Sequence, residues 1–254
     1  MGILSFFSDI GKGLSTMLRS LRHLLFPPSC LFCGDLLQGS ERYLCARCQM
    51  ALPETLHFIN ETNTFESLFR TTIPFGDGVS LYRFSRHGAL RPVLHAFKYH
   101  DNPDLAFYMG RILGERLQSS HRFDGVELLV PVPLHPRRER RRGYNQSYEL
   151  CRGIADVMGL PVSKDNLYRC RNTTSQTLLS GWDRLLAMQE AFALNDPAMF
   201  EGKHVLLVDD VVTTSATLRA CCDALLPVDG ITISMATLVI SELSPRDNYR
   251  PKNR

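Results

Sequence analysis

Apolar residues follow two different periods along this chain, and segments of the two kinds alternate. Four short segments read as strands, because they are apolar without interruption or alternate with period 2, at 79–84, 126–133, 204–210 and 231–240. Apolar positions recur every three to four residues, as on one face of a helix, over 90–99, 104–118, 144–158, 182–192 and 214–226. Strands that alternate with helices predict an α/β domain with a largely parallel sheet, from about residue 79 to 245.

The region before this domain carries a further amphipathic segment. Apolar side chains from Ile3 to Leu24 follow one another in steps of four and three residues, which predicts an N-terminal helix over 1–27. We expect this helix to pack on its own protein, with self-association or contact with a membrane surface as the alternatives. Residues 51–78 look like a connector, and residues 160–181 look irregular.

Composition excludes several classes of protein. With 254 residues, 44% of them hydrophobic and 22% charged, the chain is not mostly disordered and can bury a core. No apolar run approaches the roughly 18 residues of a membrane span, and no signal peptide is recognisable, so we expect a cytoplasmic protein without a membrane span. The net charge of +3 is too small to indicate a nucleic-acid-binding protein. The charge is uneven, however, because residues 137–152 contain six Arg and only two Glu.

Four of the eight Cys residues form two CxxC pairs, separated by eleven residues. Two such pairs direct four thiolates at one point, and this tetrahedral sulfur site suits zinc. Gly34 follows the first pair, where the turn often needs a positive φ. We therefore expect a structural zinc site in a ribbon-like module over 28–60, with buried thiols or a redox pair as the alternatives. The ligands would be Cys30, Cys33, Cys45 and Cys48. The remaining Cys residues, Cys151, Cys170, Cys221 and Cys222, are expected to be buried.

An acidic pair closes the strand expected at 204–210. Asp209 and Asp210 lie at its carboxyl end, the edge at which α/β sheets bind ligands. Small residues then lead into a helix, whose N–H groups and positive dipole end suit a phosphate. Carboxylates beside that phosphate can accept hydrogen bonds from sugar hydroxyls, so the segment predicts a site for a ribose 5-phosphate, with a plain helix cap as the alternative. The candidate residues are Asp209, Asp210, Thr213, Thr214, Ser215, Ala216 and Thr217.

A basic loop follows the strand at 126–133. Its Arg donors and the start of the next helix would neutralise a pyrophosphate group, although a run of arginines by itself is more often a solvated face. The candidate residues of this loop are Leu134, His135, Arg142, Gly143, Asn145 and Gln146.

Residues 205–217 resemble the phosphoribosyl-pyrophosphate (PRPP) motif of type I phosphoribosyltransferases, and the order of motifs over 25–240 resembles the ComF family. Proteins of this family are competence-associated and phosphoribosyltransferase-like, with an N-terminal double zinc ribbon. The resemblance implies a type I phosphoribosyltransferase-like fold, with ribose hydroxyls on the acidic pair and the 5-phosphate on residues 213–217. Lys98, Arg171, Gln176 and Arg184 also fall on the family pattern.

Two positions depart from this family pattern. Ser215 stands where the family usually has Gly, and Ala187 stands where many relatives have Asn. If the backbone at Ser215 needed a positive φ, serine would cost about 1 kcal/mol.

The resemblance leads to two hypotheses from different functional classes. As an enzyme, the protein would bind PRPP with Mg²⁺ and transfer the ribosyl 5-phosphate to a nucleophile, with release of pyrophosphate. As a binding module in DNA uptake during natural competence, it would hold single-stranded DNA through the basic loop and the zinc ribbon. The expected partners are PRPP or ribose 5-phosphate, single-stranded DNA and proteins of the competence machinery.

Overall fold

The structure is a computed structural model that describes residues 27–60, 63–69, 74–84, 90–99, 102–170 and 192–241, with only the backbone at 98 and 99. The chain divides into two compact units, Met1–Leu52 and Pro53–Arg254. The helices expected at 1–27 and 182–192 lie outside the described residues, except for residues 27 and 192. Residue 60, the expected end of the zinc module, lies in the larger unit.

Helices and strands alternate along the larger unit, as the apolar periods predict. The elements in chain order are α2 (Ala46–Met50), α3 (Thr64–Ser67), β1 (Gly78–Phe84), α4 (Leu90–Tyr99), α5 (Pro103–Ser120), β2 (Leu128–Pro131), α6 (Pro136–Arg142), α7 (Gln146–Met158), β3 (Leu167–Arg169), β4 (Phe192–Leu194), the 3₁₀ helix η2 (Pro197–Phe200), β5 (His204–Val212), α9 (Ala216–Leu225) and β6 (Thr232–Ser241). Within the described part of the chain, no helix is both long and apolar enough to cross a membrane.

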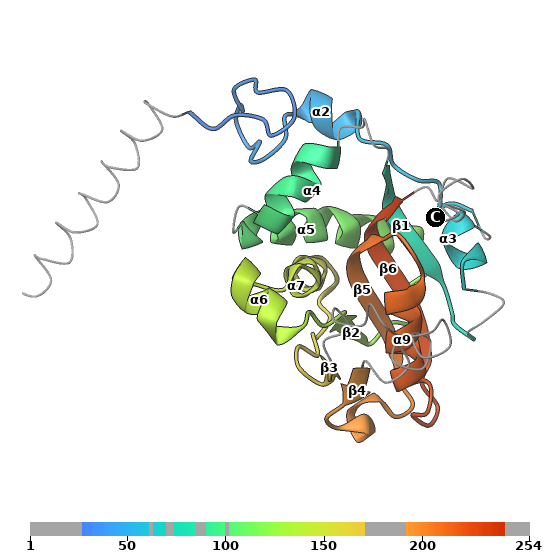
Figure 1. The fold of residues 1–254 in the computed structure, drawn as a ribbon. Helices are drawn as coiled ribbons and strands as arrows, with labels where there is room; N and C mark the ends of the chain where they lie inside the picture. The colour runs from blue at the N-terminus through green and yellow to red at the C-terminus, as the bar shows by residue number, and fades with distance from the viewer. Residues whose placement is uncertain are drawn as a thin grey trace, which may run out of the picture. The chain divides into compact units, whose positions relative to one another are not determined.

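A parallel sheet forms the centre of the larger unit (Figure 1). Its strand order is β1-β6-β5-β2, and every neighbouring pair is parallel. These are the four strands expected from the apolar segments, so the sequence prediction of a parallel α/β sheet is confirmed. The long central strands β5 and β6 pair from His204 opposite Thr232 to Val212 opposite Ile240.

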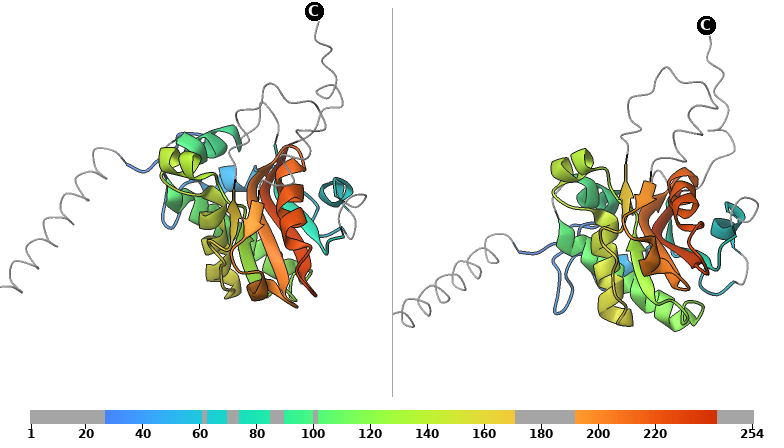
Figure 2. Two further views of the ribbon diagram at one scale, coloured as in Figure 1. Left: turned by 60° about the horizontal axis from the view of Figure 1, so that its bottom comes forward. Right: turned by 90° about the horizontal axis from the view of Figure 1, so that it is seen from below.

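Helices cover both faces of this sheet. The helices α5 and α7 pack on each other, and α7 contacts β5 and β2. In both views of Figure 2 these green and yellow helices lie on one face of the sheet, whereas the red helix α9 lies on the other. The arrangement is the three-layered one that parallel sheets need, because both of their faces are apolar.

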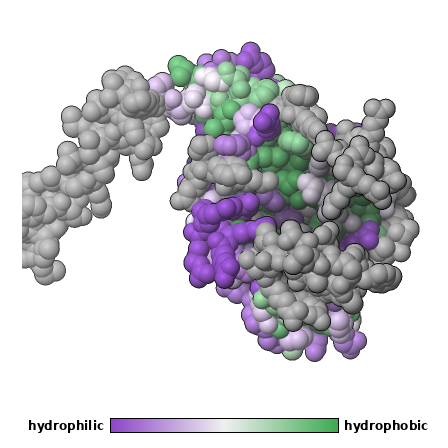
Figure 3. Space-filling view, in the orientation of Figure 1, coloured by the Kyte–Doolittle hydropathy of each residue, from purple (hydrophilic) through white to green (hydrophobic). Residues whose placement is uncertain are grey.

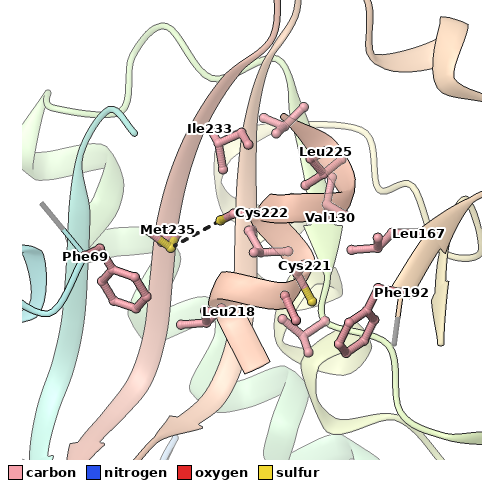
Figure 4. Packing of buried hydrophobic residues seen from close by; sticks show 14 of the residues in the cluster. Phe69, Val130, Leu167, Phe192, Leu218, Cys221, Cys222, Leu225, Ile233 and Met235 are labelled. Atoms are coloured by element: carbon pink, nitrogen blue, oxygen red, sulfur yellow. Dashed lines mark hydrogen bonds between the residues drawn. The ribbon is translucent and has the colours of Figure 1, made fainter. Parts of the chain in front are cut away.

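The face under α9 carries a large cluster of buried apolar side chains (Figure 4). Leu218, Cys222 and Leu225 of α9 point toward the sheet, and the thiol of Cys222 lies 3.9 Å from the sulfur of Met235 on β6. The apolar face that predicted this helix therefore packs on the sheet, and this contact fixes the helix beside the carboxyl end of β5.

A small antiparallel pair, β3 and β4, was not expected from the sequence. It pairs Leu167 with Leu194 and Arg169 with Phe192. Three-residue strands are too short to show a period, so residues 160–181 looked irregular. Leu167 and Phe192 are buried against Cys221, which explains why this segment is held against the α9 side of the core (Figure 4).

The described residues of the segment expected as a connector, 51–78, include part of the core, which corrects that expectation. Phe65 in α3 and Phe69 just after it are fully buried. Arg122, which follows α5, donates to the buried carboxylate of Glu66 at 2.7 Å and so connects α3 to the end of α5. Isolated aromatic residues in a polar segment show no period, which is why the pattern did not reveal this helix.

Candidate functional site

The acidic pair lies inside β5, which continues two residues beyond the expected end at 210. The strand β2 accompanies β5 only as far as Val208. The strand β5 then continues along β6 to Val212, with Asp209 opposite Thr237. The two carboxylates are therefore carried by a strand that has a neighbour on one side only, at the carboxyl edge of the sheet.

Hydrogen bonds fix the two carboxylates. Oδ1 of Asp209 accepts the Ser147 hydroxyl and the N–H of Asp210, each at 2.9 Å. Oδ1 of Asp210 accepts the N–H of Val211 at 2.7 Å. Both aspartates are half-buried. The pair is thus preorganised, with one oxygen of each carboxylate engaged by the protein.

Asp209 is difficult to ionise in this environment. Burial, and after it the charge of Asp210, raise the pKa of Asp209 to about 8. A cation or hydroxyl donor that stabilises the carboxylate form would therefore displace a proton at neutral pH. Such a ligand should bind more tightly as the pH rises through 8.

The small residues after β5 lead directly into α9. Thr213 and Thr214 are exposed, and Ser215 occupies the N-cap position without a side-chain capping bond. Ser215 has φ −67° and ψ −4°, a right-handed helical conformation. Serine therefore fits this backbone, and the strain that a positive φ would have caused does not arise.

The basic segment is a helix, α6, and not the expected loop. Nδ1 of His135 accepts the N–H of Arg137 at 3.2 Å, Pro136 begins the helix, and Gly143 ends it with φ +81°. None of the residues of α6 is buried. This surface is strongly hydrophilic (Figure 3). A helix without an apolar face has no period to detect; the proline at its start and the glycine after its end were the available signal.

The segment after α6 joins it to α4. The hydroxyl of Tyr144 and the amide N–H of Gln146 both donate to the Phe97 carbonyl, at 2.8 and 3.3 Å. Oε1 of Gln146 accepts from Arg142 at 3.1 Å. In this structure the protein engages both ends of the Gln146 amide, so these contacts support a positioning role.

Asn145 and Ser147 join this segment to the sheet. Oδ1 of Asn145 accepts the N–H of Ser147 at 3.0 Å, and Nδ2 of Asn145 donates to the carbonyl of Val132 at 3.1 Å. The hydroxyl of Ser147 then reaches Asp209, as described above. The expected contact of Asn145 and Gln146 with pyrophosphate stays a prediction.

Four other expected site residues remain without a described side chain. Lys98 lies in the last turn of α4, next to the Phe97 carbonyl, but only its backbone is described. Arg171, Gln176 and Arg184 lie outside the described residues, as does Ala187.

Two functional candidates escaped the sequence analysis. Ser147 opens α7 beside the carboxylate of Asp209, and its signal was the polar run that begins this helix. Arg169 lies on the short strand β3, with its guanidinium 5.2 Å from the ring centre of Phe192. No pattern marks a strand of three residues, so Arg169 could not be assigned from the sequence.

The four Cys residues of the CxxC pairs converge in the smaller unit. Their sulfur atoms all lie within 4.8 Å of one another, and those of Cys33 and Cys45 are 3.7 Å apart. Tetrahedral zinc with Zn–S bonds of about 2.3 Å requires sulfur atoms about 3.8 Å apart. The N–H of Cys45 points at the sulfur of Cys30, at 3.4 Å, and Gly34 has the expected positive φ of 77°. The cluster therefore fits a tetrahedral metal ion.

The Cys residues outside this cluster differ in exposure. Cys151, Cys221 and Cys222 are buried, as expected. Cys170 is exposed, which corrects the expectation, because it lies just after the edge of the small pair β3–β4.

Comparisons of the sequence relate this chain to known proteins. The family model described as "Phosphoribosyl transferase domain" matches residues 149–253. The DNA utilization protein YhgH of Shigella flexneri is 32% identical over 149 residues, which are 58% of this chain and 65% of that protein. Competence protein F of Haemophilus influenzae is 31% identical over 50% of this chain and 57% of its own length. Competence protein ComFC of Bacillus subtilis is 26% identical over 84% of both chains. The match thus spans just under two thirds of YhgH.

The contact between Ser147 and Asp209 generates a first prediction. Ser147→Ala removes a donor to the charged form of Asp209, so the pKa of this carboxyl should rise further above about 8. A carboxyl-resolved NMR titration measures it. Ser147→Thr keeps a hydroxyl and should keep the titration near that of the wild type.

Ser163→Ala is the matched control, because it removes a buried hydroxyl that contacts the sulfur of Met199 instead. An Asp209 titration that is the same in Ser147→Ala as in the wild type would contradict the assigned contact.

Proposed function

Because this chain belongs to the ComF family of competence-associated, phosphoribosyltransferase-like proteins, we propose that it binds PRPP or a related ribose 5-phosphate. The ligand would lie on Asp209, Asp210 and residues 213–217. The names of the relatives in Haemophilus influenzae and Bacillus subtilis support the further proposal that the protein serves DNA uptake.

The observation that carries this proposal is the continuity of the acidic pair with the start of α9. The strand carries two adjacent carboxylates at the carboxyl edge of the sheet, and six residues after Asp210 the chain enters a helix whose first residue is Ala216. The side chain of Ser215 makes no capping bond. The first-turn N–H groups of α9 therefore suit the oxygens of a phosphate, which the helix dipole also attracts.

Each part of the ligand has a matching group in this arrangement. The ribose hydroxyls would donate to carboxylate oxygens of the acidic pair. The 5-phosphate would take the threonine hydroxyls and the N–H groups at the start of α9. Mg²⁺ would arrive on the diphosphate of PRPP, since this ion keeps most of its waters and phosphate ligands.

The reaction that such a site supports is transfer of the ribosyl 5-phosphate to a nucleophile, with pyrophosphate as the leaving group. The chain would contribute by positioning the ribose and by stabilising the charge that develops on the pyrophosphate. The arginines of α6, a helix that begins five residues after the end of β2 at Pro131, supply positive charge for that purpose.

Calorimetry with PRPP and Mg²⁺ tests the binding proposal. Asp210→Asn removes a charged acceptor but keeps its volume, so PRPP should bind about 1–3 kcal/mol more weakly, a factor of about 5 to 150. Asp229→Asn makes the same change in an exposed loop between α9 and β6, and it should leave the affinity within twofold.

The two ends of the ligand can be tested separately. Thr214→Val should weaken ribose 5-phosphate and PRPP but not ribose, because it removes only a phosphate donor. If Asp229→Asn and Asp210→Asn weaken PRPP equally, or if the wild type binds neither phosphorylated ligand, the proposed site is wrong.

The exposed arginines of α6 favour a second candidate, a single-stranded DNA-binding module. A helix with five Arg and no buried residue gains little stability from packing, whereas nucleic-acid phosphates would neutralise its positive charge. DNA affinity should then fall steeply with salt, and Arg137→Ala with Arg140→Ala should flatten that dependence by about one to two units of log–log slope. If the salt dependence of DNA affinity is unchanged in the variant, these arginines form only a solvated face and do not contact DNA.

We also propose that the four-Cys cluster holds a structural zinc ion. The purified protein should contain about one zinc per chain by elemental analysis, and removing it should lower the thermal stability, since structural zinc contributes folding free energy. A Cys33→Ser and Cys45→Ser double variant should lose both the zinc and this stability, whereas Cys170→Ser should retain them. A metal-free protein, or a double variant as stable as the wild type, would rule the site out.

A further inference from the structure

A buried hydroxyl on the central strand β6 has no structural role of its own. Thr237 is fully buried, and its Oγ1 makes no hydrogen bond to any residue that the structure describes. Such a hydroxyl costs folding free energy, because it gives up its contacts with water and gains none in return. Valine is also β-branched and has no polar atom, so it would suit a buried strand better. The hydroxyl at this position therefore needs an explanation other than packing.

Thr237 lies beside the acidic pair in the sheet. It pairs with Asp209 on β5 and with Ser80 on β1. Neighbouring strands lie about 4.8 Å apart, and side chains at the same register position point to the same face. Leu207 and Met235 form the paired position two residues earlier, and both belong to the cluster under α9. Because side chains alternate along a strand, Asp209 and Thr237 are neighbours on that same face.

Of the two paired residues, Asp209 is the one that can take a further donor. The hydroxyl of Ser80 already donates to the carbonyl of Tyr82, at 3.4 Å. A carboxylate offers about four acceptor sites, so Asp209 can accept a third donor besides the Ser147 hydroxyl and the N–H of Asp210. A threonine in a strand has more than one staggered rotamer about its Cα–Cβ bond, and a rotation there redirects the hydroxyl toward its neighbour.

The charges around Asp209 explain why such a donor matters only after ionisation. Among the described residues, the titratable groups that share an electrostatic interaction with Asp209 come from four elements. They are Asp210 of β5, Cys151 of α7, Arg169 of β3 and Cys221 of α9. Burial raises the pKa of both thiols, so of these four groups only Arg169 carries a positive charge. Neutral donors therefore have to stabilise much of the charge on this carboxylate.

We propose that Thr237 is a positioning residue of the ribose site, whose hydroxyl donates to Asp209 when this residue is a carboxylate. Thr237 does not touch the ligand and acts through Asp209, in addition to Ser147. The inference rests on the proposed function, because it assigns the hydroxyl to the carboxylate that would hold the ribose. The contact itself is measurable in the protein without ligand, so the two can fail separately.

A carboxyl-resolved NMR titration of the ligand-free protein tests the contact. Thr237→Val should raise the pKa of Asp209 by about one unit, since it removes one donor to the charged form. Thr237→Ser keeps a hydroxyl and should titrate like the wild type. Thr232→Val is the matched control, because it makes the same change at the exposed start of β6 and should leave the titration of Asp209 unchanged.

Thermal unfolding separates this role from a structural one. At pH 6, below the Asp209 pKa of about 8, Thr237→Val should unfold at the same temperature as the wild type or higher. Ser234→Ala should unfold at a lower temperature, because the Ser234 hydroxyl accepts the N–H of Asp77 at 3.1 Å and contacts Nε2 of His204 at 2.9 Å. This second variant should nevertheless keep the wild-type titration of Asp209.

The pH dependence of ribose 5-phosphate binding tests the consequence for the site. At pH 7, Thr237→Val should bind this ligand about fivefold to tenfold more weakly, because fewer molecules carry an ionised Asp209. At about pH 10 Asp209 is ionised in both proteins, so the two affinities should lie within about twofold of each other. Thr232→Val should match the wild type at both pH values.

Two results would overturn the inference. One is an Asp209 titration that is the same in Thr237→Val as in the wild type, and ribose 5-phosphate binding by the wild type would then leave the proposed function standing. The other is a loss of affinity that persists at about pH 10, which would indicate a packing defect. If Thr237→Val does not fold, Thr237→Ala decides by the same titration. A raised pKa in a protein that does not bind ribose 5-phosphate would end the proposed function and keep the contact.

Discussion

The strand β6 stays paired with β5 as far as Val212, whereas β2 stops opposite Val208. This difference in length places Asp209 and Asp210 on extended backbone at the carboxyl edge of the sheet, with one side of the strand no longer covered by a neighbour. The rest of the candidate site depends on it. The start of α7 approaches from the side that β2 has left, and the hydroxyl of Ser147 reaches Asp209 there. The start of α9 follows β5 directly along the chain.

The polar residues around this edge divide into two groups by their contacts. Tyr144, Asn145 and Gln146 use their side chains on carbonyls and N–H groups of the protein, and so tie α6 to α4 and to the end of β2. Four of the five arginines of α6, all but Arg142, and the threonines Thr213 and Thr214 before α9 are exposed. A ligand with several phosphate oxygens needs both groups, because donors bind it well only when their backbone is fixed beforehand.

Sequence patterns predicted the larger elements, and local contacts decided the smaller ones. The strands β1, β2, β5 and β6 and the helices α4, α5, α7 and α9 all carry a clear apolar period, which tertiary packing then satisfies. The helix α3 depends on two isolated aromatic residues, β3 and β4 are three residues long, and α6 has no apolar face at all. Such elements depend on capping residues at their own ends, or on packing against residues that lie far away in the sequence.

The same distinction holds for the candidate site. The position of the acidic pair at the carboxyl edge was predictable, because a buried apolar run ended in two aspartates. The roles of Ser147 and Arg169 were not, since each depends on a side chain that folding brings from elsewhere: Asp209 for the first and Phe192 for the second. The backbone of Ser215 was likewise invisible, and its ordinary helical φ of −67° removes the conformational reason for a glycine.

We propose that a ribose 5-phosphate lies across the acidic pair and the start of α9. A crystal structure of the protein soaked with ribose 5-phosphate tests this binding mode. We expect the sugar hydroxyls within hydrogen-bonding distance of the Asp209 and Asp210 carboxylates, with the phosphate at residues 213–217. Phosphate density elsewhere on the protein, with this edge of the sheet empty at a saturating ligand concentration, would contradict it.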